Sequence, residues 1–277
     1  MARINSITQL PISFPNGGSH QLRGVVYTPK RFTTAVIMAH GFPGDSSGGT
    51  HRRSLALSRA GFLVMRFDFT GCGASDGTHE ERLMSGDVRD LRAAIRFLSA
   101  HVQYERLVLL GHSTGALTVP FAAQDRRVDA VILSSGQGFL DRGAHLDFTD
   151  KQVRELWLTG HTHTLYPMNW SAKRERISKK FYDEFFTLPL EKTLKKLRKP
   201  ALVIHGERDE AVPVQCARDA FKLIKGPKRL VIIPKADHRF IINSSAYQRA
   251  LISFLRGFTR LPARTAAPRA RAASLIR

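Results

Sequence analysis

The feature that most constrains the fold is a series of apolar runs, each ending at a glycine or proline and followed by sequence with helical spacing. The runs are continuously apolar and do not alternate, which is typical of strands covered on both faces in a mostly parallel sheet. They are TTAVIMAHG, FLVMRFDFTG, RLVLLG, VDAVILSSG, ALVIHG and RLVIIP. Alternation of strand and helix over this length predicts an α/β fold with a doubly wound, mostly parallel sheet.

Three segments between or after these runs carry apolar residues at helical spacing, which places the apolar side chains on one face of a helix. These stripes are Val88, Leu91, Ile95 and Leu98; Ala217, Ala220, Phe221 and Ile224; and Tyr247, Leu251, Phe254, Leu255 and Phe258. Two further strands are expected to open the chain, around RINSITQLPISF and QLRGVVYTP. The turn signal Pro15-Asn16-Gly17-Gly18 separates them.

About sixty residues between VILSSG and ALVIHG have no clear strand pattern. Thr149 and Gln152 have the spacing of a capping box, and Phe181 and Phe185 stand four residues apart as a helical pair. We therefore predict a helical cap insertion over about residues 139–198, lying over the ends of the strands. An ordinary long connection is the alternative, although connections of this length are usually functional.

The composition fits a globular protein that needs no covalent staples. A chain of 277 residues can bury a large core, and its two cysteines, Cys72 and Cys216, cannot form a disulfide framework. The N-terminus has no apolar core of the signal-peptide kind, and no window approaches 18 apolar residues. These observations predict a cytoplasmic protein without a membrane span.

The formal net charge of +20 is unusual, and it bears on partners more than on fold. Residues 262–277 carry four arginines and no acids, so we expect a basic, mostly disordered tail beyond an α/β domain of residues 1–261. Contact of this tail with nucleic acid, anionic lipid or an acidic partner is the less favoured hypothesis. The chain lacks the mixed aromatic and basic pattern of an RNA-binding motif.

The segment Gly111-His112-Ser113-Thr114-Gly115 matches the pattern G-x-S-x-G. Small residues are required on either side of the serine because the chain turns sharply from strand to helix and exposes the hydroxyl. An apolar strand precedes the motif, and the following residues can form a helix with Pro120 in its early turns. The context therefore predicts Ser113 as a nucleophile.

A serine hydroxyl needs a base to take its proton, and the base needs a carboxylate to fix its tautomer. In this kind of fold the chain order is serine, acid, histidine. We predict Asp209 as the acid, because it lies in the loop after ALVIHG, with Glu207 and Glu210 as solvated loop charges and Asp141 as the alternative acid. His238 follows RLVIIP and is the only histidine after Asp209, which predicts it as the base.

A tetrahedral intermediate needs two N–H donors directed at its oxyanion. One should be the amide of Thr114, the residue after the nucleophile. The other should come from the loop His40-Gly41-Phe42-Pro43-Gly44, and Phe42 is the better donor because Pro43 has no N–H. We expect His40 to shape this loop and not to act as the base.

Taken together, these pieces resemble the α/β-hydrolase superfamily over almost the whole chain up to the tail. The loop at residues 40–44 and the run Arg66-Phe67-Asp68-Phe69-Thr70-Gly71-Cys72-Gly73-Ala74-Ser75-Asp76-Gly77 resemble the cinnamoyl/feruloyl esterase-like branch and its serine-aminopeptidase-type (S33-like) relatives. The resemblance implies a carboxylic ester hydrolase that needs no cofactor and no metal. It implies a triad of Ser113, Asp209 and His238, with Phe42 and Thr114 at the oxyanion hole, and gives Asp68 no catalytic role. The cap departs from that branch, since it looks all-helical and basic here.

Several functions remain open at this stage. Hydrolysis of a small-molecule acyl ester is the leading hypothesis, and thioester or amide (peptide) hydrolysis by the same triad is its rival. A non-catalytic binding protein on the same fold, with a basic tail contacting anionic partners, is the alternative of another class. A metal site at His161-Thr162-His163 is disfavoured because no Cys or carboxylate lies at helical ligand spacing. The predicted cap also carries a cluster of basic residues. This cluster can bind anionic groups such as coenzyme A phosphates, or it can be only a solvated helix face. It comprises Lys173, Arg174, Arg176, Lys179 and Lys180.

Overall fold

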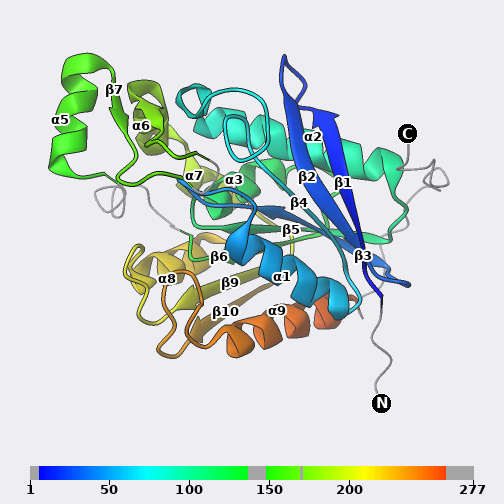
Figure 1. Cartoon of the computed structure of the whole chain (residues 1–277). Helices are drawn as coiled ribbons and strands as arrows, with labels where there is room; N and C mark the ends of the chain where they lie inside the picture. The colour runs from blue at the N-terminus through cyan, green and yellow to red at the C-terminus, as the bar shows by residue number, and fades with distance from the viewer. Residues whose placement is uncertain (1–5, 137–147, 169–170, 260–277) are drawn as a thin grey trace.

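The computed structural model describes residues 6–136, 148–168 and 171–259, which form an eight-stranded sheet between two layers of helices (Figure 1). The strand order is β1-β2-β4-β3-β5-β6-β9-β10, with β2 antiparallel to both of its neighbours and the other pairs parallel. The predicted α/β fold with a doubly wound, mostly parallel sheet is confirmed. The strands are β1 (Thr8–Pro15), β2 (Gln21–Thr28), β3 (Thr34–Ala39), β4 (Leu63–Phe67), β5 (Arg106–His112), β6 (Ala130–Ser134), β9 (Ala201–Gly206) and β10 (Lys228–Ile233).

Both faces of the sheet are buried, as the continuous apolar runs require. On β5, Leu107 and Leu109 lie in the core beneath α2, α3 and α8, whereas Val108 and Leu110 lie in the core on the opposite face beneath α1 and α9. The three predicted stripes lie on α2, on α8 with its C-cap residue, and on α9. The helices of these layers are α1 (Gly48–Arg59), α2 (Met84–His101), α3 (Thr114–Ala122), α8 (Val214–Leu223) and α9 (Ser244–Thr259). Within the described ranges, no helix is long and apolar enough to cross a membrane.

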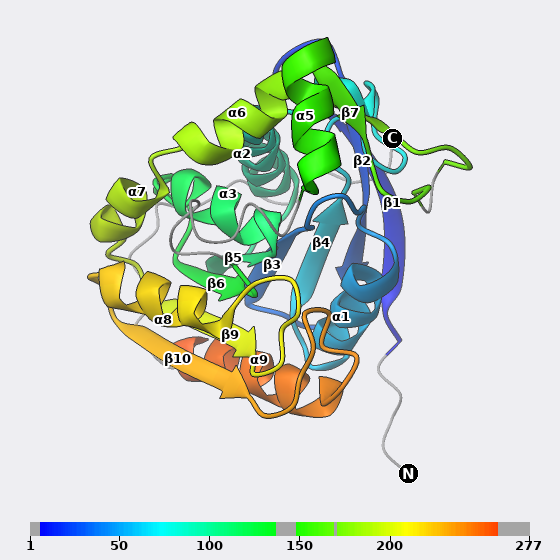
Figure 2. The same ribbon diagram turned by 90° about the vertical axis from the view of Figure 1, so that its left-hand side faces the viewer.

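The chain between β6 and β9, here called the insert, lies beside the end of the sheet to which the parallel strands point (Figure 1). Figure 2 looks onto that end and shows α5 and α6 above it. The expected capping box is present, since Gln152 Oε1 accepts from Thr149 N at 2.9 Å and Thr149 Oγ1 accepts from Gln152 N at 3.3 Å. Its helices are α5 (Asp150–Thr159), α6 (Lys179–Thr187) and α7 (Leu190–Lys196).

The expectation of an all-helical insert was wrong, because two short strands pair antiparallel within it. They are β7 (His161–His163) and β8 (Arg176–Ser178), and only their central residues Thr162 and Ile177 are buried. Three-residue strands with one buried position each leave no alternating pattern in the sequence. The first part of the predicted cap, residues 137–147, and the predicted tail, residues 262–277, lie outside the described residues, so the domain boundaries stay predictions.

The antiparallel pairing of β2 with β4 generates a prediction about stability. Gly24 pairs with Phe67, and a Cβ at position 24 would lie 2.2 Å from the Arg66 carbonyl oxygen. We expect Gly24→Ala to force the strands apart and lower the free energy of unfolding by about 1–3 kcal/mol in urea denaturation.

Gly257 on α9 provides the matched control, because no atom of the described residues lies within 4 Å of a Cβ at this position. Gly257→Ala should raise the free energy of unfolding by about 0.5–1 kcal/mol, since alanine favours the helix. Equal stability of Gly24→Ala and the unmodified protein would contradict the described register.

Candidate active site

Ser113 lies at the sharp turn between β5 and α3, with φ 55° and ψ −125°. A non-glycine residue in this conformation is strained and needs the surrounding structure to hold it. The flanking glycines have no space for side chains: a Cβ at Gly111 would lie 2.2 Å from the Gly115 carbonyl oxygen, and one at Gly115 would lie 2.3 Å from that of Ala39. The sequence pattern is therefore explained by a strand, a tight turn and a helix.

Asp209 and His238 lie together after the neighbouring parallel strands β9 and β10. His238 Nδ1 is 2.9 Å from each carboxylate oxygen of Asp209. The Asp209 side chain is fully buried and also accepts N–H bonds from Ala211 at 3.0 Å and Val212 at 2.7 Å. Burial alone would raise the pKa of Asp209, but hydrogen bonds from His205 and His238 outweigh it and hold this pKa well below its usual range. The carboxylate is thus fixed in its charged form.

His205 is a polar neighbour that the sequence analysis missed. This fully buried side chain near the end of β9 places Nε2 3.1 Å from Asp209 Oδ2 and 2.8 Å from the Val212 carbonyl oxygen. The available signal was a histidine inside the otherwise apolar run ALVIHG, four residues before the predicted acid. His205 and His238 therefore hold the same carboxylate from two directions.

The serine turn and the His238 loop contact each other through His112. The His112 and His238 rings have centroids 5.0 Å apart, and Ser135 Oγ lies 3.4 Å from the His238 carbonyl oxygen. Burial, reinforced by Arg53, keeps the pKa of His112 well below 6.5, so this ring is neutral. Among the described residues no hydrogen bond joins Ser113 Oγ to His238, and such bonds often tighten only when substrate is bound.

The loop after β3 lies directly against the serine, since a Cβ at Gly41 would come within 2.8 Å of Ser113 Cβ. His40 fixes this loop. Its Nε2 accepts from Phe69 N at 3.1 Å, so the proton sits on Nδ1, which donates to the Gly41 carbonyl oxygen at 2.9 Å. Burial, with Arg82 nearby, lowers the pKa of His40 to about 3. His40 is therefore a neutral loop-shaping residue, as expected.

The two amides expected at the oxyanion hole lie on the two sides of this contact. Phe42 follows Gly41, and Thr114 begins α3, where the helix dipole favours negative charge. In the part of the chain that the structure describes, neither amide donates a hydrogen bond to a protein acceptor. Among the described residues, no acceptor therefore occupies either N–H group.

The Phe42 side chain connects this loop to the insert. Its ring stacks on Phe181 of α6 at 5.0 Å between centroids and contacts Phe148 at 6.0 Å. On its other side it stacks on His79 at 5.7 Å. Aromatic pairs at these distances contribute about 0.5–1.5 kcal/mol each beyond their buried area. The insert therefore packs directly on the loop that carries a candidate oxyanion donor.

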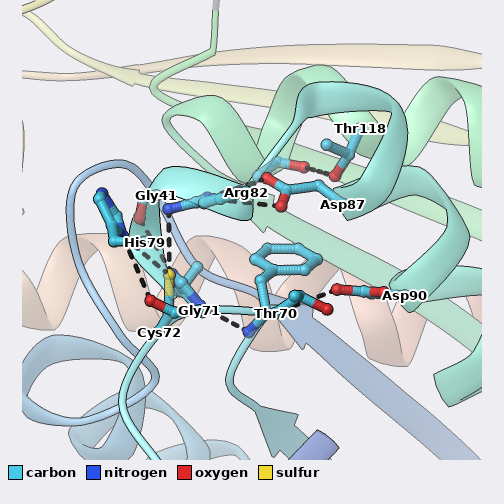
Figure 3. A network of polar contacts seen from close by, with 12 residues as sticks. Gly41, Thr70, Gly71, Cys72, His79, Arg82, Asp87, Asp90 and Thr118 are labelled. Atoms are coloured by element: carbon cyan, nitrogen blue, oxygen red, sulfur yellow. Dashed lines mark hydrogen bonds and ion pairs between the residues drawn. The ribbon is translucent and has the colours of Figure 1, made fainter. Parts of the chain in front are cut away.

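A buried ion pair supports these rings (Figure 3). Arg82 and Asp87 are each 1% exposed, with Nη2 2.9 Å from Oδ2. Burial acts to lower the pKa of Arg82, but the Asp87 carboxylate outweighs it and raises that pKa, so the guanidinium stays charged. The Arg82 Cζ lies 5.7, 5.4 and 5.9 Å from the ring centroids of Phe42, Phe69 and Phe181. One cation thus contacts the loop after β3, the segment after β4 and the insert.

Cys72 is the remaining polar neighbour of Arg82 in this network. Arg82 Nη1 lies 3.4 Å from its Sγ, and His79 Nδ1 lies 3.6 Å away (Figure 3). Burial raises the pKa of the Cys72 thiol to about 12, so it is a neutral structural group. Cys216 is also buried, and neither cysteine forms a disulfide within the described ranges.

The acids near Asp209 hold loops together. Glu207 and Glu210 are exposed, as expected, but Glu207 Oε2 accepts from Lys235 N at 2.8 Å and Glu210 Oε2 accepts from His238 N at 3.1 Å. The alternative acid, Asp141, lies outside the described residues.

Asp68, for which no catalytic role was expected, binds backbone amides of the loops behind the site. Its carboxylate accepts from Ser46 N at 2.7 Å and Ala74 N at 3.0 Å.

His161 and His163 lie on β7 with ring centroids 6.0 Å apart. No cluster of three or more metal-ligating side chains occurs in the described ranges.

Comparison with known proteins identifies the family. Residues 36–250 match the alpha/beta hydrolase family. The chain is an alpha/beta hydrolase. This confirms the superfamily inferred from the sequence and supports hydrolase activity.

Curated relatives of this hydrolase include an uncharacterized protein and a lipase. The uncharacterized protein YfhR of Salmonella typhi is 28% identical over 236 residues, which cover 82% of this chain and 73% of that protein. Lysophosphatidylserine lipase ABHD12 of Danio rerio is 27% identical over 252 residues, covering 80% of this chain and 58% of the lipase.

Solved structures with the same fold include esterases. Est1E of Butyrivibrio proteoclasticus, with ferulic acid bound, has a TM-score of 0.77 at 22% identity. The match covers 90% of this chain and 99% of the Est1E chain. The esterase domain of a Rhodothermus marinus protein has a TM-score of 0.66 at 27% identity, with 91% of this chain covering 98% of it. These neighbours agree with the esterase-like resemblance.

The buried ion pair generates a stability prediction. Arg82→Met leaves the Asp87 carboxylate buried without its cation, so the free energy of unfolding should fall by about 3–5 kcal/mol in urea denaturation. The double variant Arg82→Met/Asp87→Leu removes both charges and should recover most of this loss. An equal loss in the single and the double variant would show that the unpaired Asp87 carboxylate is not what destabilises Arg82→Met.

Two buried histidines make stability depend on pH. Burial, with the neighbouring Arg82 cation, lowers the pKa of both His40 and His79 from 6.5 to about 3. In the unfolded chain these two histidines therefore bind protons near pH 6.5, whereas in the folded chain they stay neutral down to about pH 3. The free energy of unfolding should fall as pH drops through this window, by up to about 1.4 kcal/mol per pH unit and histidine.

Urea denaturation at successive pH values measures this slope. His79→Gln should flatten it, whereas His163→Gln, at an exposed position on β7, should leave it unchanged. Parallel curves for the two variants would contradict the assignment to buried His79.

Proposed function

We propose that this hydrolase cleaves carboxylic esters through an acyl-enzyme on Ser113, with His238 as the base and Asp209 as its carboxylate partner. The observation that carries the proposal is the 2.9 Å contact of His238 Nδ1 with both oxygens of buried Asp209, in a loop that contacts the Ser113 turn. Nucleophile, acid and base follow one another in the chain order typical of this fold.

In this mechanism the Asp209 carboxylate accepts a hydrogen bond from Nδ1–H of His238, which leaves the unprotonated Nε2 as the proton acceptor. Nε2 takes the Ser113 proton as Oγ attacks the ester carbonyl, and the carbonyl oxygen becomes an anion. The amides of Phe42 and Thr114 donate to this oxyanion. His238 then gives the proton to the departing alcohol. Water, deprotonated by His238, cleaves the acyl-enzyme, releases the acid and restores Ser113.

Support for an ester substrate comes from the relatives. One structural neighbour is an esterase domain, another was solved with ferulic acid bound, and one curated relative is a lysophosphatidylserine lipase by name. A thioester or amide would react through the same acyl-enzyme and remains the second candidate. A panel of p-nitrophenyl esters of increasing acyl length, an acyl-CoA and a peptide amide, compared by kcat/KM, discriminates between these classes.

A fluorophosphonate probe and steady-state kinetics test the triad. The unmodified protein should form a covalent adduct that Ser113→Ala abolishes. Ser113→Ala and His238→Ala should each lower kcat on the order of a millionfold, with little further loss in the double variant, because the residues act as a unit. Asp209→Asn should lower kcat by about ten-thousandfold, since the wrong His238 tautomer is then favoured.

Glu210→Gln is the matched control for Asp209→Asn, because Glu210 lies in the same loop and accepts a hydrogen bond from the His238 backbone, not from its ring. It should retain most of the activity. Absence of labelling in well-folded protein would instead favour a non-catalytic binding role, and additive losses in the double variant would separate Ser113 from His238.

A further inference from the structure

The insert exposes an unusual amount of apolar surface. Seven large apolar side chains are strongly exposed among the described residues, and five of them lie on the insert. Single exposed apolar residues are ordinary, but a group of them marks an interaction surface. We call this group the outer face of the insert. It comprises Trp157 (68% exposed), Leu158 (85%), Leu165 (52%), Tyr166 (75%) and Phe186 (41%).

These side chains come from elements that pack together. Helix α5 carries Trp157 and Leu158 and contacts β7, and Leu165 and Tyr166 follow β7 directly. Lys179 at the start of α6 lies 4.2 Å from the Trp157 ring centroid, which joins α6 to the same surface. Figures 1 and 2 both show α5 and β7 at the periphery of the molecule, away from α1, α9 and β10.

Cations surround the apolar side chains. Lys151 and Arg154 are exposed on α5, seven and four residues before Leu158, so the three share one helix face. Lys173, Arg174 and Lys180 are exposed nearby in sequence. Residues 148–198 hold eleven Lys and Arg against six Asp and Glu. The outer face is therefore apolar at its centre and cationic around it.

We propose that the outer face of the insert binds the surface of anionic lipid membranes. Tryptophan and tyrosine favour the headgroup region of a bilayer, and lysine and arginine around them are attracted to anionic headgroups. A helix with both features lies in the interface with its apolar side chains between the lipids. This binding does not depend on the proposed catalysis.

Charge complementarity favours an anionic membrane over a second copy of the chain, the chain's own basic segment or nucleic acid. A second copy of the chain carries the same formal charge of +20 and is repelled. The chain's own residues 262–277 are also basic and have no acids. Nucleic acid would match the cations but leave exposed Leu158 and Trp157 without an apolar environment. An anionic bilayer accommodates both.

Vesicle binding tests the proposal. The chain has two tryptophans, so Trp170→Phe leaves Trp157 as the single reporter. Vesicles of phosphatidylcholine with phosphatidylglycerol should shift its emission to the blue, and brominated lipid should quench it. Binding should weaken as salt is raised, and vesicles of phosphatidylcholine alone should bind at least about tenfold more weakly.

Variants separate the outer face from the overall charge. Trp157→Gln/Leu158→Gln and Lys151→Glu/Arg154→Glu should each reduce co-sedimentation with anionic vesicles by at least about tenfold. Lys225→Glu/Arg229→Glu is the matched control, because it makes the same charge change at exposed positions near β10. The control should retain binding within a few-fold.

Three results would overturn the proposal. Equal losses in the control and the α5 charge variant would show attraction by net charge alone. An unshifted Trp157 emission would show that the outer face stays in water. Self-association that is lost in Trp157→Gln/Leu158→Gln, without vesicle binding by the unmodified protein, would assign this face to a second copy of the chain.

Discussion

The site depends on the close passage of the β5–α3 turn across the end of β3. Gly115 lies so near β3 that a Cβ would come within 2.3 Å of the Ala39 carbonyl oxygen. The following loop is held equally close, with Gly41 against Ser113. Because β3 and β5 are neighbours in the sheet, the backbone alone brings the serine and the loop amides together. In the proposed mechanism, the side chains of His238 and Asp209 then supply the proton transfer.

A single buried cation extends this arrangement to the insert. Arg82 contacts rings from the loop after β3, from the end of β4 and from α6, while Asp87 keeps it charged. Buried ion pairs contribute little net stability compared with apolar packing, but an unpaired member is costly. We therefore interpret the Arg82–Asp87 pair as fixing the loop after β3 and the insert in one relative arrangement. Any displacement of Arg82 would separate its charge from the buried Asp87 carboxylate.

Most of the sheet was predictable because its strands are apolar on both faces, and chain order placed Asp209 and His238 correctly after adjacent strands. Helix α1 was not predicted, since its buried face is largely polar and includes Thr50 and Arg53. Arg82 and His205 were missed for a related reason. A buried polar side chain is defined by partners distant in sequence, and no periodicity reveals them. The catalytic roles stay proposals drawn from sequence order and contact geometry.

The insert leaves the sheet after β6 and returns at β9, and these two strands are direct neighbours. The insert is therefore one enlarged crossover connection between β6 and β9. Because these strands pair directly, the hydrogen-bond register of the eight-stranded sheet does not depend on the length of the insert. Evolution can exchange such a segment as a module while β5, β9 and β10 keep the serine, the acid and the histidine in place. In this chain the ring of Phe181, stacked on Phe42, ties that segment to the loop beside the serine.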